Sequence, residues 1–231
     1  MRLYTYTLRV DDGAAPNPYG GVCTLTICKP VIRRTADIGD WVVGLGPKRA
    51  PGNHDLSNHV IYAMCVSDVL SLEDYDAHCR ECLPSKIPDW HPDAPFEHQV
   101  GDCIYYPRGH GLAQRRGVHN KGNEKVDHDG VNALLADRVF FYFGQRAVEL
   151  PKNLEAIMHN TQGHKVNANE ALKDRFVEWA LGGFGRGLHP RILYGDPLHK
   201  HLVRPGREKA TWSACGKRRI VSEQDEICSI C

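Results

Sequence analysis

The chain has 231 residues, a formal net charge of +1 at pH 7 and a hydrophobic content of 42%. These values are typical of a soluble globular protein with one substantial core, or one core plus a small appended module, and we favour the second arrangement. No run approaches the roughly 18 apolar residues that a membrane helix needs, and the N-terminus lacks a signal-peptide pattern, so we expect a cytoplasmic protein.

The first 46 residues predict two strands separated by a stiff loop. Leu3 to Val10 interleaves aliphatic and aromatic residues with Thr and Arg, the pattern of a strand. Pro16 to Gly21 contains two prolines and two glycines, which exclude a helix. Ile38 to Gly46 then combines a Gly-Asp turn with an apolar run, which is typical of a buried strand.

The middle of the chain is less regular. His59 to Leu70 predicts a strand, and Ser71 is placed to cap a short helix that follows it. From Leu83 to Ala136 the chain is rich in Pro, Gly, Asn and His, with one apolar island from Val100 to Tyr106. An irregular stretch of this length inside a compact domain is usually functional or partly disordered, and we expect it to be functional.

Regular structure returns in the last third of the main domain. Arg138 to Val148 predicts a strongly apolar strand, and Pro151 is placed in the first turn of a helix. A second helix is expected from Asn169 to Leu181, where Gly182-Gly183 ends it.

Four strings follow one another along the chain: "APNPYGGVCTLTICKPVIRRTADIGDWVVG", "HVIYAMCVSDVLSLEDY", "GDCIYY" and "FFYFG". In this order they resemble the nucleotide modification associated domain 2 family, and the likeness runs from residue 1 to about residue 199. The resemblance implies a link to the making or handling of modified nucleic-acid bases. It implies no particular reaction.

The order of elements also resembles the PUA-like folds, including EVE, ASCH and YTH domains, which hold a base in an aromatic-walled pocket. We therefore expect an α+β fold, a PUA-like (EVE/ASCH-like) mixed sheet or partly open barrel with flanking helices, plus a small zinc-stabilised C-terminal module. The expected domains are residues 1–199 and a zinc-knuckle-like tail, residues 200–231.

The tail carries the sharpest chemical pattern, His201-x13-Cys215-x12-Cys228-x2-Cys231. Zinc prefers four N or S donors in a tetrahedron, and a segment this short can hardly fold without a cross-link. The spacing predicts a structural zinc ion, with His199 as an alternative nitrogen ligand.

The other cysteines give weaker patterns. His78-Cys79-Arg80-Glu81-Cys82 holds a second close pair, which Cys103 or His91 could complete, but no further cysteine pair stands at a zinc-like spacing, so we expect cysteines at a helix end without metal. Cys23, Cys28 and Cys65 lie in or beside apolar segments and are expected in the core.

A domain that reads a base needs stacking surfaces, groups for the base edge and cations for phosphate. The candidates for stacking are Trp41, Tyr19 and Tyr62, and those for the base edge are Asp12, Asn17, Lys29 and Asp40. The candidates for phosphate contact are Arg33, Arg34 and the basic residues of the tail, Arg204, Arg207, Lys217, Arg218 and Arg219.

If the domain is instead an enzyme, the irregular middle should carry its chemistry. His beside Asp is what general acid–base work requires, although both are also ordinary loop residues. The candidate catalytic residues are Asp102, Tyr105, His119, His128, Asp129 and Asn132. The common signatures of nucleotide hydrolases, esterases, metalloproteases, dinucleotide-linked oxidoreductases and base deaminases are missing from the sequence.

Three hypotheses follow. The leading one is a phage or bacterial protein that binds modified bases in nucleic acid, with DNA favoured over RNA, or a nucleotide, within a DNA-modification or phage-defence pathway. The second is an enzyme that transfers or removes a group on a nucleobase or nucleotide. The third is an interaction adaptor for protein partners in such a system.

Overall fold

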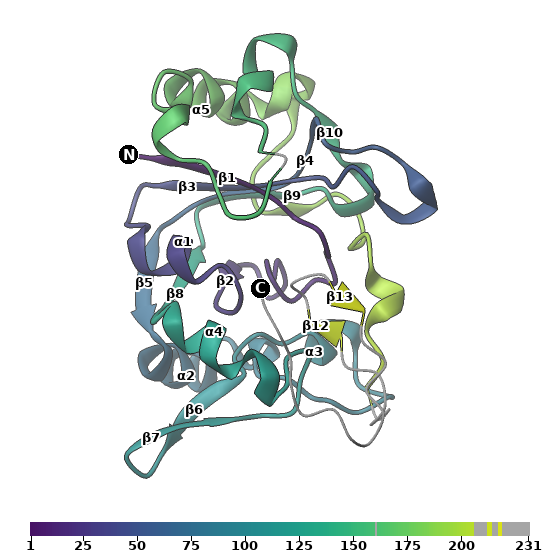
Figure 1. The fold of residues 1–231 in the computed structure, drawn as a ribbon. Coiled ribbons are helices and arrows are strands. Elements are labelled where there is room, and N and C mark those ends of the chain that lie inside the picture. The colour runs from purple at the N-terminus through teal and green to yellow at the C-terminus, as the bar shows by residue number, and fades with distance from the viewer. Residues whose placement is uncertain (160, 206–211, 214–216, 219–231) are drawn as a thin grey trace.

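The computed structural model describes residues 1–159, 161–205, 212–213 and 217–218 (Figure 1). Its main sheet has the strand order β1-β3-β4-β9-β11, and β10 pairs with β4 off this path. These strands are β1 (Leu3–Thr7), β3 (Trp41–Leu45), β4 (His59–Cys65), β9 (Val139–Tyr142), β10 (Val148–Glu149) and β11 (Ile192–Leu193). The sheet is mixed, because β1 runs parallel to β3 and β11 runs parallel to β9, whereas β4 is antiparallel to β3 and β9.

A second, antiparallel sheet lies beside the first, with the order β2-β8-β5. Its strands are β2 (Cys23–Leu25), β8 (Asn132–Ala136) and β5 (Asp68–Ser71). Two further antiparallel pairs are β6 (Tyr105–Arg108) with β7 (Gly111–Gln114), and β12 (Trp212–Ser213) with β13 (Lys217–Arg218). The α-helices are α1 (Pro30–Thr35), α2 (Leu72–Glu81), α3 (Phe96–Gln99), α4 (Glu124–Asp129) and α5 (Lys173–Leu181).

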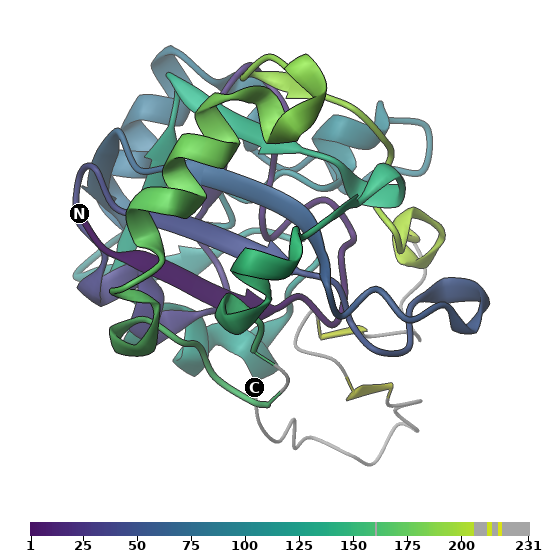
Figure 2. The same ribbon diagram turned by 90° about the horizontal axis from the view of Figure 1, so that it is seen from above.

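The described residues form four layers in the order α5, main sheet, second sheet and α2, with an apolar core between each neighbouring pair. These three cores arise because side chains alternate between the two faces of each strand. One face of the main sheet packs on α5, and the other face packs on the second sheet. In β3, for example, Val43 faces the α5 side and Val42 faces the second sheet. In β8, Leu134 faces the main sheet, whereas Leu135 faces α2. Figure 2 shows α5 lying across the strands of the main sheet.

The expected regular elements of the N-terminal half are confirmed, with shorter bounds. The strands expected at Leu3–Val10 and Ile38–Gly46 are β1 and β3. The segment His59–Leu70 divides into β4 of the main sheet and β5 of the second sheet. Ser71 caps α2 as expected, because its Oγ accepts from the Asp74 N–H at 3.0 Å.

The C-terminal half departs more from expectation. The strand expected from Arg138 to Val148 is interrupted by a 3-10 turn at Gly144–Arg146, and the helix expected after Pro151 is the 3-10 helix Lys152–Ile157. The helix expected from Asn169 begins at Lys173, as α5, and it is followed at Gly183–Gly187 by a π-turn.

The architecture is mixed α+β, as the sequence predicts. In the part of the chain that the structure describes, neither sheet closes into a barrel. The PUA-like assignment stays a prediction. No helix in that part is both long enough and apolar enough to cross a membrane.

A buried lysine fixes the proline-rich loop. Lys86 is 0% exposed, and its ammonium shares its three N–H groups among four acceptors at 2.8–3.0 Å. These acceptors are Asn17 O, Asn17 Oδ1, Val22 O and Thr24 Oγ1. The Thr24 hydroxyl donates in turn to the buried Asp102 carboxylate at 2.6 Å. The loop is therefore held by a lysine and an aspartate that share one hydroxyl.

A second buried carboxylate, Asp11, fastens the segment that leaves β11. Asp11 Oδ1 accepts from the Tyr142 hydroxyl at 2.6 Å, and Oδ2 accepts from the Leu198 N–H at 3.0 Å. The backbone of Asp11 also exchanges hydrogen bonds with His199. Burial raises the pKa of Asp11 to about 7, although both hydrogen bonds oppose the shift.

Candidate functional site

Cys28 occupies a strained turn between β2 and α1. Its φ of 59° and the φ of 44° at Lys29 put two consecutive residues in the left-handed region, which costs about 1–2 kcal/mol for each residue. The Cys28 N–H donates to Asp127 Oδ1 at 2.8 Å, and its carbonyl accepts from Arg33 Nη1 at 3.3 Å. Residues of α1 and α4 therefore hold the backbone of Cys28 in place.

The imidazole of His119 lies between the Cys28 thiol and the Asp127 carboxylate. Its Nε2 is 3.4 Å from Cys28 Sγ, and its Nδ1 is 2.6 Å from Asp127 Oδ2. The Tyr105 hydroxyl donates to the same carboxylate oxygen at 2.9 Å. Cys28 and His119 are each 2% exposed and Asp127 is 0% exposed. We call these three residues the Cys-His-Asp row.

The charges of the row are coupled. Burial alone lowers the pKa of His119, but the Asp127 carboxylate outweighs it and holds that pKa well above the ordinary value. Burial alone raises the pKa of Asp127, but the charge and hydrogen bond of His119 reverse the shift and lower it. Both directions favour an imidazolium beside a carboxylate at neutral pH.

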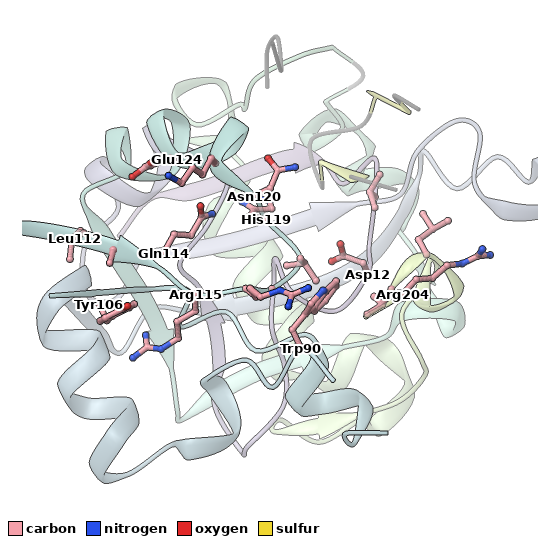
Figure 3. Close-up of a pocket in the computed structure, with 18 of the residues that line it drawn as sticks. Asp12, Trp90, Tyr106, Leu112, Gln114, Arg115, His119, Asn120, Glu124 and Arg204 are labelled. Carbon is pink, nitrogen blue, oxygen red and sulfur yellow. The ribbon is translucent and has the colours of Figure 1, made fainter. Parts of the chain in front are cut away.

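His119 also forms part of the wall of a cavity of about 610 Å³ (Figure 3). We call it the arginine-lined cavity, because five cationic side chains and two carboxylates line it. The cations are Arg108, Arg115, Arg116, Lys121 and Arg204, and the carboxylates are Asp12 and Glu124. Figure 3 shows that these side chains come from the β6–β7 hairpin, the segment after it, the N-terminal segment and the segment near residue 204.

Trp90 adds an aromatic surface to this cavity. Among the cations, Arg115 is already paired with Asp76 and lies over the Tyr106 ring at 4.5 Å, whereas Arg116 and Arg204 are exposed. The cavity therefore offers what an anionic ligand with an aromatic ring needs, namely cations together with a stacking surface.

The Cys-His-Asp row could also hold a metal ion. Each residue offers one ligand atom, and these atoms lie within 4.8 Å of one another. A thiolate, an imidazole and a carboxylate are all ligands that zinc accepts.

Residues 1–203 match the family described as "Nucleotide modification associated domain 2". The chain belongs to this family. No curated protein and no solved structure matches the chain. The family match places the protein in nucleotide modification systems without assigning it a specific role.

In this member of the nucleotide modification associated domain 2 family, candidates from three predicted sets lie around the Cys-His-Asp row. The three sets are the base-edge, the catalytic and the phosphate candidates. Asp12, predicted for the base edge, lines the arginine-lined cavity with His119, which was predicted as catalytic. Tyr105, also predicted as catalytic, contacts Asp127. Arg33, predicted for phosphate, is buried at 0% exposure behind Cys28, and its Nη2 has no partner among the described residues.

Other predicted catalytic residues lie near the row without joining it. His128 packs its ring on Tyr105 at 4.6 Å, and its Nε2 is buried without a partner in the described chain. Asp129 is exposed and accepts from Arg34 through its carbonyl. The carbonyl of Asn132 accepts from Arg33 Nε. Asp102 belongs instead to the Lys86 network.

Several residues predicted to contact a base are structural in this fold. Asn17 is 0% exposed, and its amide bonds to Val100 O, the Tyr19 N–H and Lys86 Nζ. Trp41 packs edge-on against Phe176.

The remaining base-edge and stacking candidates are also engaged within the protein. Asp40 pairs with Arg2, and the Tyr62 hydroxyl bonds to Tyr6. Lys29 lies over the Tyr6 ring at 4.6 Å. Tyr19 is half-buried against Phe96.

Sequence reasoning missed the cysteine of the row and part of the cavity. Cys28 was expected in the core, and it is indeed buried, but its neighbours are His119 and Asp127. Trp90, Arg115 and other cavity residues fall in the irregular stretch that was expected to be functional.

The predicted zinc ligands of the tail cannot be placed together. His201 is exposed in the 3-10 helix Lys200–Leu202. Cys215, Cys228 and Cys231 lie outside the described residues, as do Arg207 and Arg219. Lys217 and Arg218 form β13, and Arg204 lines the arginine-lined cavity.

Proposed function

We propose that this chain binds a nucleotide, or a modified base within DNA, in the arginine-lined cavity, and that it acts in a DNA-modification or phage-defence pathway. The observation that carries the proposal is the combination of five cations with Trp90 around one cavity. The family match supplies the nucleotide context. Cations serve phosphate groups, and the indole ring serves as a stacking surface for a base.

Charge reversal at the exposed rim tests this proposal. The double variant R116E/R204E should weaken binding of deoxycytidine 5′-monophosphate by about 100-fold or more, because it removes two charge-assisted contacts that contribute about 1.5–3 kcal/mol each. Isothermal titration calorimetry measures the change, and deoxycytidine without phosphate should bind weakly to both proteins. With single-stranded DNA, the salt dependence of binding should also become shallower in the variant.

The matched control is Arg138→Glu, which reverses an exposed charge in the turn between β8 and β9, away from the cavity lining. This variant should bind as the wild type does. Equal weakening by R138E and by the rim variant would show that net charge matters and the cavity does not.

We also propose that the tail holds a structural zinc ion through His201, Cys215, Cys228 and Cys231. The spacing of these residues supports the proposal. Elemental analysis of protein purified without chelators should give about one zinc per chain, with loss of that zinc in Cys228→Ala. Cys28→Ala separates the two possible metal sites, because zinc lost in that variant and kept in Cys228→Ala would place the ion at the Cys-His-Asp row instead.

A further inference from the structure

We propose that Cys28 is the nucleophile of an acyl-transfer activity that removes an acyl group from the exocyclic amine of a nucleobase. The proposal rests on the proposed function, because the arginine-lined cavity is where the nucleotide part of the substrate would bind.

The first argument is the arrangement of the Cys-His-Asp row. The sulfur faces Nε2 of His119 and the carboxylate faces Nδ1, on the other side of the ring. This is the order that nucleophilic catalysis requires, with a thiol, a base that takes its proton and a carboxylate that orients the base.

The same distances exclude an ion bound between Asp127 Oδ2 and His119 Nδ1. Ligands of a tetrahedral zinc ion stand about 2.0–2.3 Å from the metal, so two of them are roughly 3 Å or more apart. Asp127 Oδ2 is 2.6 Å from His119 Nδ1, which is a hydrogen-bond distance. The carboxylate therefore supports the ring and does not share an ion with that nitrogen.

The second argument is the strained turn. Left-handed backbone at both Cys28 and Lys29 is unfavourable, and such strain persists where the surrounding structure enforces it, often at functional sites. Here Asp127 serves the turn as well as the ring, since its Oδ1 accepts from the Cys28 N–H while Oδ2 contacts His119. One carboxylate thus fixes the sulfur and the imidazole relative to each other.

The third argument is access to the cavity. His119 lines the arginine-lined cavity, and its Nε2 touches the Cys28 sulfur. Cys28 itself is 2% exposed and does not line the cavity, so a ligand there reaches the sulfur only when the His119 ring turns aside. Asp12, which is buried beside the same wall, adds a polar group that an amide N–H of the substrate can contact.

The reaction balances with water alone. The proton of the Cys28–His119 pair rests on His119, where the Asp127 carboxylate favours it, and the Cys28 thiolate attacks the carbonyl carbon of the acylated amine. The C–N bond breaks, the leaving amine takes the proton from His119, and a thioester forms on Cys28. Water, activated by His119, then cleaves the thioester to release a carboxylic acid and the thiol.

The test uses two acyl donors, N4-acetyl-2′-deoxycytidine 5′-monophosphate and p-nitrophenyl acetate. The wild type should release dCMP from the first and p-nitrophenolate from the second, and peptide mass spectrometry should find the acetyl group on Cys28. Cys28→Ala should abolish both reactions. His119→Asn should slow them by about 100-fold or more, because it removes the base.

Cys82→Ala is the matched control, because Cys82 is an exposed cysteine at the end of α2. Its variant should react at the wild-type rate. Equal rates in the wild type and Cys28→Ala, or acetyl groups on Cys82 and none on Cys28, would overturn the proposal.

A separate measurement of dCMP binding distinguishes failure of this activity from failure of the proposed function. It also shows whether the Cys28→Ala variant is folded. If Cys28→Ala and the wild type both bind dCMP and neither gives an acyl-enzyme, nucleotide binding stands and the nucleophile is wrong. If Cys28 becomes acetylated by p-nitrophenyl acetate while dCMP does not bind, the nucleophile stands and the ligand assignment of the cavity is wrong.

Asp127 is a positioning residue in this scheme. Asp127→Asn should slow acetyl transfer and also move the midpoint of its pH profile to lower pH, because the carboxylate no longer stabilises the His119 imidazolium. A slower reaction with an unmoved pH midpoint would contradict this role.

Discussion

The K86M variant, in which a buried lysine becomes methionine, should have a free energy of unfolding about 3–5 kcal/mol below that of the wild type. Methionine fills similar space but donates no hydrogen bond. The Val22 carbonyl would lose its donor, the Asn17 carbonyl would keep only the Thr24 N–H, and the buried Asp102 would lose its neighbouring positive charge. Urea unfolding followed by circular dichroism measures the change.

The surface variant Lys125→Met is the matched control, because Lys125 is exposed on α4, and it should change stability by less than about 0.5 kcal/mol. The double variant K86M/D102N should recover part of the loss, because it removes the uncompensated carboxylate as well. If K86M and the wild type had the same urea midpoint of unfolding, the Lys86 ammonium would not hold the loop.

Local patterns were sufficient for much of the main sheet. The alternation in β1 and the apolar run of β3 predict strands correctly, because both strands are buried against two layers. Ser71 predicts the start of α2 correctly, because its capping hydrogen bond joins residues that are close in the sequence. β8 was missed, although it is the central strand of the second sheet. Its five residues, Asn132–Ala136, are separated from the end of the short helix α4 by only two residues, so the sequence shows no long periodic segment there.

The site was predictable only in part, for a related reason. The irregular stretch from Leu83 to Ala136 was expected to be functional, and it does supply His119, Asp127 and much of the arginine-lined cavity. Cys28 could not be paired with His119 from the sequence, because 91 positions separate them and they meet only in the folded chain, where α1, which follows Cys28, packs against α4, which follows His119. An apolar neighbourhood in the sequence, as in TLTICKP, does not show that a cysteine faces a histidine.

Acidification should stabilise the wild type more than it stabilises the Asp11→Asn variant. Asp11 has a pKa of about 7 in the folded protein against 3.8 ordinarily, because burial disfavours its charged form. Between these values the folded protein binds more protons than the unfolded chain, so the free energy of unfolding falls as pH rises. A shift of about three units corresponds to at most about 4 kcal/mol. Urea unfolding of both proteins at several pH values from about 4.5 to about 8 measures it.

The informative quantity is the stability of the wild type minus that of Asp11→Asn, because buried carboxyls such as Asp12 and Asp102 titrate in both proteins and cancel. This difference should decrease steadily with rising pH. The control Asp137→Asn removes an exposed carboxylate, and its difference from the wild type should stay nearly constant. A constant difference for Asp11→Asn as well would mean that Asp11 ionises as freely in the folded protein as in the unfolded chain. In that case the bonds from Tyr142 and Leu198 would fully offset its burial.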